Sequence, residues 1–198
     1  VVTFIRKAEN LDYVAAIEFL AARAGIEIPH DEAASRDSVS RKRILEMNRA
    51  AALFFHKCLY DPRYGKEALE YLTGTRQLTG ATIKHFGLGY SPNDFGILTS
   101  YLKRLGYTEE EMTAGFLCGI SQKTGRPYDY FRNRVMFPII DVAGNVVAFG
   151  GRVMDDSKPK YLNTSDTPAF KKSRNLFALN FAKGKCTEKM ILCEGYMD

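Results

Sequence analysis

The stretch RNRVMFPIIDVAGNVVAFGGRV, residues 132–153, decides the fold class of this chain. Two runs rich in apolar residues, VMFPIID and NVVAFGGRV, flank a short Gly-containing turn at residues 142–145, a pattern that predicts a β-hairpin. Pro138 has no backbone N–H to donate, so we expect it at a sheet edge or a bulge. Because the pattern changes from helical to extended near Phe116, we predict a largely antiparallel sheet near residues 116–165.

The part of the chain before this sheet is predicted to be helical. The sequence SRKRILEMNRAAALFFHKCLY, residues 40–60, has apolar side chains at helical spacing. These are Ile44, Met47, Ala51, Phe55 and Cys58. Asn10 can cap an earlier helix that begins at Leu11 and is closed by Gly25 and Pro29. Between the two helices, PHDEAASRDSVS is polar and aperiodic, which indicates a linker.

Shorter helices are expected between the long helix and the sheet, around residues 65–72, 80–86 and 93–105. Thr108 and Glu111 have the spacing of a capping box, which predicts the start of another helix. After the sheet, the apolar run at residues 190–192 predicts a buried strand, with Glu194 at its carboxyl end, where ligands collect in α/β sheets. The predicted fold class is α+β: a helical amino-terminal part, a mostly antiparallel mixed sheet, and one strand of an α/β unit.

Composition limits the classes to which the chain can belong. Its 198 residues are 45% hydrophobic, enough for a substantial core, and no apolar run approaches the roughly 20 residues that span a bilayer. The net charge of +5 is regional: residues 126–189 hold twelve Lys/Arg and six Asp/Glu, and the remainder sums to −1. This basic, aromatic-rich region fits either a solvated face or a groove for a phosphate backbone with rings on which bases stack.

The four cysteines are widely separated and lack C-x-x-C spacing. They are Cys58, Cys118, Cys186 and Cys193. We interpret them as thiols rather than as zinc ligands or a disulfide framework. The pair Gly150-Gly151 permits close approach of a backbone, but the P-loop and dinucleotide-binding fingerprints are both absent.

Five segments within residues 132–198 carry a more specific signal. In order they are RNRVMFPI, FGGRV, PKYLN, FKKSRNLF and EGYMD. Together they resemble the catalytic core of bacterial DnaG-type DNA primases, and the resemblance extends upstream through NLDYVAAIEFLAARAGIEIP and YLTGTRQLTGATIKHFGLGYSP. It implies a DNA-directed RNA polymerase that makes short RNA primers on single-stranded DNA by metal-assisted nucleotidyl transfer.

The resemblance also implies how the chain is organised. Residues 1–30 are expected to be a helical segment that follows a zinc ribbon, and residues 31–40 a linker. Residues 41–188 correspond to the N-terminal subdomain of the polymerase core, and residues 189–198 to the start of its Toprim subdomain. In this family a later Asp-x-Asp motif completes the metal site, so the chain alone is expected to be inactive.

Individual residues receive roles from the same resemblance. Glu194 is expected to be catalytic and, with Asp198, to bind Mg²⁺ or Mn²⁺, for which carboxylates are suitable ligands. Zinc is implied only for the preceding ribbon. The residues expected to bind nucleotide and phosphate are Arg152, Lys160, Tyr161, Asn163 and Lys172. Arg132 and Arg134 are expected to bind the template strand.

The implied partners are a single-stranded DNA template and ribonucleoside triphosphates, with a replicative helicase and a single-strand-binding protein contacting regions outside the chain. The resemblance implies a monomer in the cytoplasm, at the replication fork, with no membrane partner. The roles of Lys171, Lys172 and Arg174 are interchangeable at this stage, because they are so close in sequence. Two alternatives stay open: another Toprim enzyme, such as a phage primase-helicase or a nuclease, and a non-catalytic module that binds single-stranded nucleic acid.

Overall fold

The computed structural model of the protein describes residues 1–9, 13–26, 39–185 and 188–197. The chain forms two units, Val1–Ser38 and Val39–Asp198. Asn10, the predicted helix cap, and most of the predicted linker lie outside the described residues.

The first unit contains two helices, α1 (Val2–Ala8) and α2 (Tyr13–Ala24). The second confirms the predicted amino-terminal helix, and the first lies within residues 1–30, the segment expected to be helical, at a place where no separate helix was predicted. Gly25 follows α2 with φ +68°, the left-handed conformation that commonly ends a helix and that glycine adopts without a Cβ clash.

The longest helix of the second unit, α3 (Arg41–Tyr60), confirms the helical spacing found in the sequence. The predicted apolar face is buried in the structure, at Ile44, Met47, Ala51, Phe55 and Cys58. Ser40 caps the helix, because its side chain accepts a hydrogen bond from the backbone N–H of Arg43 at 3.3 Å. The helix therefore presents one apolar stripe to the rest of the unit.

The shorter predicted helices are present with changed boundaries. They are α4 (Lys66–Glu70), the π-helical turn η1 (Tyr71–Thr75), α5 (Gly80–His85), α6 (Ile97–Arg104) and α7 (Glu109–Ala114). The capping box at Thr108 and Glu111 is formed, with both of its reciprocal hydrogen bonds. The helix predicted from residue 93 begins only at Ile97, because the Asp94 side chain accepts the Gly96 N–H and makes a turn first.

The predicted hairpin is confirmed as the centre of a four-stranded antiparallel sheet. The strands are β1 (Gly89–Ser91), β4 (Arg134–Ile140), β5 (Val146–Val153) and β6 (Tyr161–Asn163), in the order β1-β4-β5-β6. Pro138 lies beyond the part of β4 that pairs with β1, and a register shift follows at Ile139/Ile140. Pro138 therefore lies at a local edge of β4, and the bulge comes after it rather than at it. A separate two-stranded ribbon consists of β2 (Cys118–Ile120) and β3 (Pro127–Asp129).

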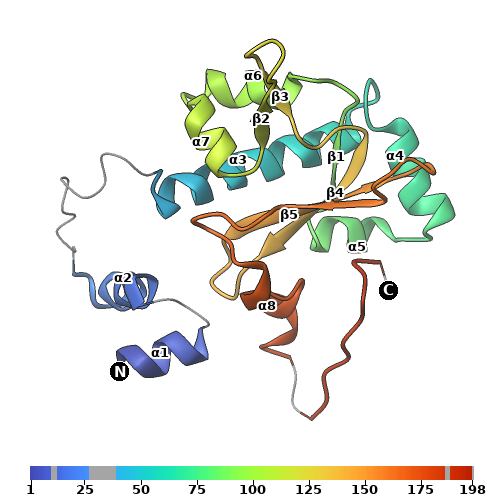
Figure 1. Ribbon diagram of the computed structural model, residues 1–198. Coiled ribbons are helices and arrows are strands. Elements are labelled where there is room, and N and C mark those ends of the chain that lie inside the picture. Colours follow the sequence, from blue (N-terminus) through green and yellow to red (C-terminus); the bar gives the residue numbers. More distant parts are fainter. Residues whose placement is uncertain (10–12, 27–38, 186–187, 198) are drawn as a thin grey trace. The chain divides into compact units, whose positions relative to one another are not determined.

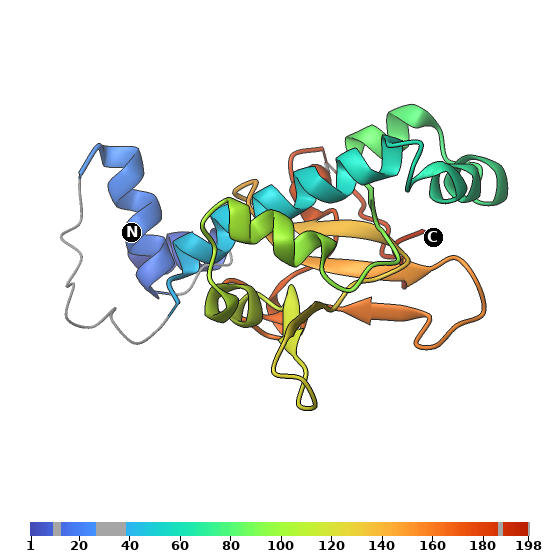
Figure 2. The ribbon, with the colours of Figure 1, turned by 90° about the horizontal axis from the view of Figure 1, so that it is seen from above.

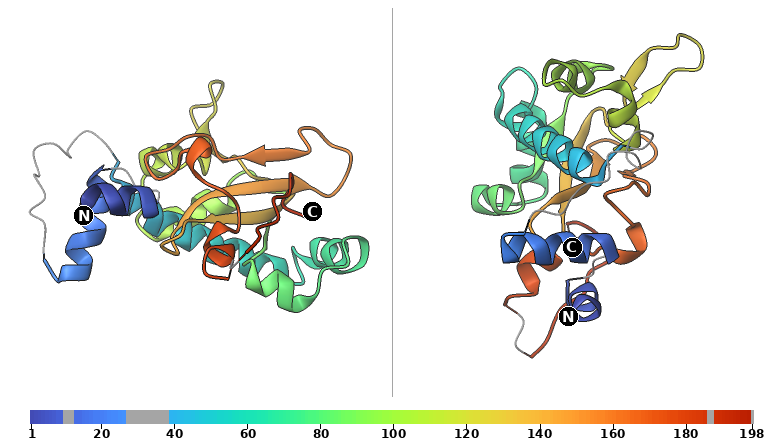
Figure 3. Two further views of the ribbon diagram at one scale, coloured as in Figure 1. Left: turned by 90° about the horizontal axis from the view of Figure 1, so that it is seen from below. Right: turned by 90° about the vertical axis from the view of Figure 1, so that its left-hand side faces the viewer.

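Helices cover both faces of the four-stranded sheet (Figure 1). On one face, Met47 and Phe55 of α3 belong to the same buried cluster as Met136 and Phe149, and Figure 2 shows α3 extending in roughly the same direction as β4 and β5. On the other face, Val135 and Phe137 pack in a second cluster with α5 and with residues near the carboxyl end. Figure 3 shows α8 (Leu179–Ala182) and the carboxyl-terminal segment on that side.

The predicted strand at residues 190–192 is not formed. Ile191 and Leu192 are 89% and 80% exposed, and neither pairs with a strand of the described part of the chain. A strand of an α/β unit is stabilised by a neighbouring strand and by packing on both faces, and this segment has neither. The rest of the predicted α+β fold is confirmed.

The described cysteines agree with the interpretation as thiols. Cys58 and Cys118 are buried and Cys193 is exposed, all three without a disulfide, while Cys186 lies outside the described residues. Burial raises the pKa of the Cys58 thiol to about 11. Across the described ranges, no helix combines the length and the apolar character needed to cross a bilayer.

Candidate nucleic-acid interface

The predicted nucleotide-binding residue Arg152 lies on the sheet face opposite to α3. Its Cα is opposite Tyr161 in the β5–β6 pairing, and its guanidinium carbon lies 5.4 Å from the ring centroid of Tyr71 and 5.6 Å from that of Tyr161. Its Nη1 donates to the carbonyl of Val153 at 3.3 Å, whereas its buried Nε has no hydrogen-bond partner among the described residues. Arg152 is only 6% exposed, so an anionic ligand on this face would meet its positive charge without reaching the buried Nε.

The predicted residues Tyr161 and Asn163 lie beside Arg152, and the structure adds Tyr196 to them. The Tyr196 hydroxyl donates to Oδ1 of Asn163 at 2.8 Å, and its ring lies 5.9 Å from that of Tyr161. The same ring stacks on Phe137 at 5.0 Å, and burial raises the pKa of its hydroxyl. Three of the five predicted nucleotide-binding residues are thus brought together on one sheet face.

The structure gives a packing reason for the Gly150-Gly151 pair. A Cβ on Gly150 would lie 2.5 Å from the Tyr196 ring, and one on Gly151 would lie 2.8 Å from the Phe131 ring. The two glycines therefore admit an aromatic ring on each face of β5. The close approach expected at this pair is made by side chains of the same chain.

Lys160 and Lys172 are exposed and do not join this cluster through any described contact. Lys160 lies just before β6, and its carbonyl accepts the Val153 N–H at 3.1 Å. Lys172 is in the 3₁₀ turn η2 (Lys172–Arg174), and its backbone N–H donates to Oδ1 of Asp166 at 3.0 Å. The neighbouring Lys171 forms an ion pair with Asp166 at 3.4 Å, which leaves the Lys172 ammonium as the more available of the two lysines.

The two arginines predicted to bind a template lie in different environments. Arg134 is only 8% exposed. Its Nη1 donates to the carbonyls of Gly151 at 3.2 Å and Pro159 at 2.9 Å, and burial lowers the pKa of the guanidinium. Contact with an external strand would require breaking these bonds, so the position of Arg134 favours a structural role over the predicted one.

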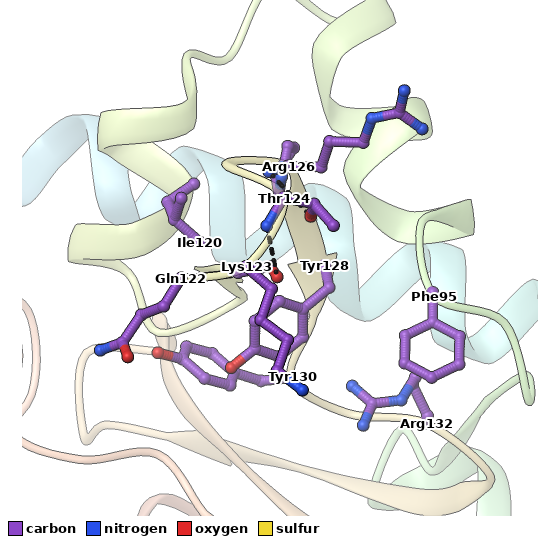
Figure 4. Close-up of a pocket in the computed structure, with 11 residues that line it drawn as sticks. Phe95, Ile120, Gln122, Lys123, Thr124, Arg126, Tyr128, Tyr130 and Arg132 are labelled. Carbon is purple, nitrogen blue, oxygen red and sulfur yellow. Dashed lines mark hydrogen bonds between the residues drawn. The ribbon is translucent and has the colours of Figure 1, made fainter.

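Arg132, by contrast, lines an open pocket (Figure 4). Its guanidinium carbon lies 4.5 Å from the ring centroid of Phe95 and 5.6 Å from that of Tyr128, and its Nη1 donates to the carbonyl of Asp129. The pocket has a volume of about 810 Å³. Its lining residues are Phe95, Ile120, Ser121, Gln122, Lys123, Thr124, Arg126, Pro127, Tyr128, Tyr130 and Arg132.

The sequence did not predict this pocket, because its walls come from separate segments. Phe95 precedes α6, and the other lining residues belong to the β2–β3 ribbon and its flanks. The aromatic and basic residues at positions 126–132 were the available signal, since they belong to the basic region of the sequence. Nothing in the sequence pattern pointed to Phe95.

The predicted metal site cannot be assembled from the described residues. Glu194 is exposed, and Asp198 lies outside the described part of the chain. No group of three His, Cys, Asp or Glu side chains with the geometry to hold a metal ion occurs among the described residues. Glu194 alone does not supply the oxygen ligands that Mg²⁺ or Mn²⁺ takes.

Comparison with known proteins identifies the family. Residues 54–183 match the family described as the DNA primase catalytic core, N-terminal domain. The chain belongs to this family. The DNA primase of Clostridium acetobutylicum is 41% identical over 201 residues, which cover 100% of the chain and 33% of that primase.

Solved primase structures share the fold. The DnaG primase catalytic domain bound to single-stranded DNA is 34% identical with a TM-score of 0.71, over 79% of this chain and 50% of that one. The zinc-binding and RNA polymerase domains of Aquifex aeolicus primase are 29% identical with a TM-score of 0.64, over 93% of this chain and 44% of that one. The chain therefore spans about a third of the Clostridium primase and about half of these structures.

Proposed function

We infer that the chain is the N-terminal part of the catalytic core of a DNA primase, which synthesises RNA primers on a single-stranded DNA template. The observation that carries the proposal is the cluster of Arg152, Tyr161 and Asn163 in a chain of the primase family. A triphosphate brings several negative charges, and the guanidinium of Arg152, which is 6% exposed, forms no ion pair with a described carboxylate that would neutralise its positive charge.

The nucleotide in this proposal lies against the Arg152 face of the sheet. The exposed ammonium groups of Lys160 and Lys172 supply further positive charge, and Tyr161 offers a ring beside Arg152. Glu194 lies two residues before Tyr196. The Tyr196 ring stacks on Phe137 and its hydroxyl donates to Asn163, so these contacts hold the segment on the Arg152 face of the sheet. With Asp198 and carboxylates from the rest of a primase, Glu194 would hold the divalent metals that stabilise the attacking and leaving oxygens when bound.

A chimera tests the proposal. The segment of the Clostridium acetobutylicum primase that aligns with this chain is replaced by the chain, and incorporation of ribonucleotides on single-stranded DNA is measured. We expect template-dependent primers from the chimera. A folded chimera that binds template and makes no primers would contradict the proposal.

Single substitutions in the chimera test the assigned roles. Lys172→Ala is expected to raise the KM for ribonucleoside triphosphates by roughly tenfold, because a charge-assisted contact is lost. Lys171→Ala is the matched control and should change the KM much less, since Asp166 already engages that lysine. Glu194→Gln should lower kcat by roughly a hundredfold or more while template affinity persists. Equal effects at Lys171 and Lys172 would argue against the assignment.

A further inference from the structure

We propose that Tyr71 is a positioning residue, whose ring holds the guanidinium of Arg152 in the orientation in which its charge meets a triphosphate. The inference rests on the proposed function and deepens it. Tyr71 lies in η1, outside the sheet, and the sequence assigned it no role. It acts through Arg152 and does not itself contact the nucleotide.

The described contacts of the Arg152 guanidinium are mainly aromatic. Its carbon lies 5.4 Å from the ring centroid of Tyr71 and 5.6 Å from that of Tyr161. Apart from the bond of Nη1 to the Val153 carbonyl at 3.3 Å, it forms no hydrogen bond or ion pair with the described residues. The two rings come from different elements, η1 and β6, so each restricts the guanidinium in its own direction.

A ring holds a cation without neutralising it. A carboxylate would fix the Arg152 side chain more firmly, but it would cancel the positive charge that attracts a triphosphate. A cation–π contact leaves that charge in place, and it is strongest where water is excluded. Arg152 is only 6% exposed, so the contact with Tyr71 is largely shielded from water.

The position of the Tyr71 ring is itself fixed at two points. The next residue, Leu72, is completely buried and belongs to the cluster that packs on the Arg152 face of the sheet. At the other end of the ring, Nε of Arg76 donates to the Tyr71 hydroxyl at 2.7 Å. The ring is therefore in place before a ligand binds, and a preorganised site loses less entropy on binding.

The π-helical form of η1 explains the contact with Arg76. Side chains that meet on an α-helix lie three or four residues apart, whereas a π turn joins residues i and i+5. The Arg76 N–H donates to the Tyr71 carbonyl at 3.0 Å, and the Arg76 side chain reaches the hydroxyl of the same tyrosine. Single π turns inside helices frequently occur at functional sites, and here the turn supplies the second anchor of the ring.

Substitutions in the chimera test the role through the kinetics of ribonucleoside triphosphate use. Tyr71→Leu removes the ring, and we expect the KM to rise about fivefold, the effect of losing one cation–π contact. The kcat should change by less than about twofold, because the contact supports ground-state and transition-state binding alike. Tyr71→Phe keeps the ring, so its KM should stay within about twofold of the unchanged chimera. If Tyr71→Phe were as impaired as Tyr71→Leu, the hydroxyl would be the active group and the proposal would be wrong.

Tyr107→Leu is the matched control for a general loss of stability. Tyr107 is also half-buried, and its ring centroid lies 4.2 Å from the guanidinium carbon of Arg43. It packs against the cluster that contains Met47, on the other face of the sheet. We expect Tyr107→Leu to leave the KM unchanged. An equal rise in KM for Tyr107→Leu and Tyr71→Leu would mean that the KM reports stability, and the proposal would be withdrawn.

A double-mutant cycle shows whether Tyr71 acts through Arg152. The affinity of the chimera for inorganic tripolyphosphate is measured by isothermal titration calorimetry, with Arg152→Met as the second change. Tyr71→Leu alone should weaken binding about fivefold, and it should have no further effect in the Arg152→Met background. The same loss in both backgrounds would contradict the proposal, because Tyr71 would then act independently of Arg152.

The outcomes separate this inference from the proposed function. If the chimera makes primers and Tyr71→Leu leaves its KM unchanged, the proposed function stands and the positioning role is wrong. If the cycle shows the expected coupling and the chimera makes no primers, the positioning role is supported and the proposed function is contradicted. A folded chimera that neither makes primers nor binds tripolyphosphate would contradict both.

Discussion

Arg132 and Arg134 have the same chemistry and lie two residues apart, yet their environments differ. The guanidinium of Arg132 lines an open pocket, whereas that of Arg134 binds the carbonyls of Gly151 and Pro159 inside the protein. Arg134 therefore anchors the loop before β6, from which Lys160 projects. The template-binding role expected for Arg132 stays a prediction, and the contacts of Arg134 favour a role in holding that loop in position.

Replacement of Arg134 should destabilise the protein. Arg134→Met keeps an apolar stem but leaves two carbonyls without their charged donor, and we expect the free energy of unfolding to fall by about 2–3 kcal/mol. Arg132→Met, at the half-buried neighbour, should cost less than about 1 kcal/mol. Urea unfolding followed by circular dichroism measures both, and equal losses would contradict the structural role of Arg134.

Asp129 gives the protein a pH-dependent contribution to stability. Burial raises the pKa of this carboxyl above its ordinary 3.8. As pH rises from 3.8, Asp129 loses its proton in the unfolded chain before it does so in the folded protein. The stabilisation that Asp129 contributes is therefore fully present below pH 3.8 and is lost as pH rises through the folded pKa. We expect the free energy of unfolding, relative to that of Asp129→Asn, to decrease over that window. An increase with pH would mean that the hydrogen bonds that Leu98 and Thr99 donate to Asp129 outweigh burial.

The contact between α3 and β1 explains how a strand of three residues is retained. Gly89 of β1 lies against the backbone of α3, where a Cβ would be 2.6 Å from the carbonyl carbon of Phe55. Both elements also belong to the core, through Phe55 and Tyr90. The strand exists because α3 packs on it and β4 pairs with it.

Gly89→Ala should therefore be strongly destabilising. The clash involves helix backbone, which cannot rotate away, and we expect a loss of at least about 2 kcal/mol in the free energy of unfolding. Gly80→Ala, in the first turn of α5 with open space around it, is the control and should leave stability unchanged or slightly higher. Thermal unfolding of the two variants checks this. A similar melting temperature for both would show that α3 and β1 can separate at little cost.

The excess positive charge of the molecule lies in residues 126–189, the region that contains most of the residues proposed to bind negatively charged ligands. A strand held by several cations releases counterions, so the logarithm of its affinity should fall with the logarithm of salt by about 0.7 per phosphate contacted. Arg132→Glu should flatten this slope, and Lys42→Glu, an exposed position on α3, should leave it unchanged. Fluorescence anisotropy with a labelled oligomer across salt concentrations measures the slopes. Equal flattening by the two variants would indicate diffuse attraction instead of a defined groove.

The sequence by itself determined the elements whose patterns are local. The apolar stripe of α3, the β4–β5 hairpin and the capping box at Thr108 all follow from spacing along one segment, and the structure confirms them. The family likewise follows from motifs in order along the chain. Local patterns suffice because helical and hairpin hydrogen bonds join residues that are close in sequence.

Only the tertiary structure decided what depends on distant partners. β1 has no pattern of its own and forms by pairing with β4, while residues 190–192 have a strand pattern but pair with no strand of the described part of the chain. The ring of Phe95 becomes part of a pocket because the N–H of Asp129, in a distant segment, donates to the Phe95 carbonyl. Arg132 and Arg134 differ in how deeply their side chains are buried. The burial of a side chain depends on which distant segments pack over it, and the sequence pattern around the residue does not show this.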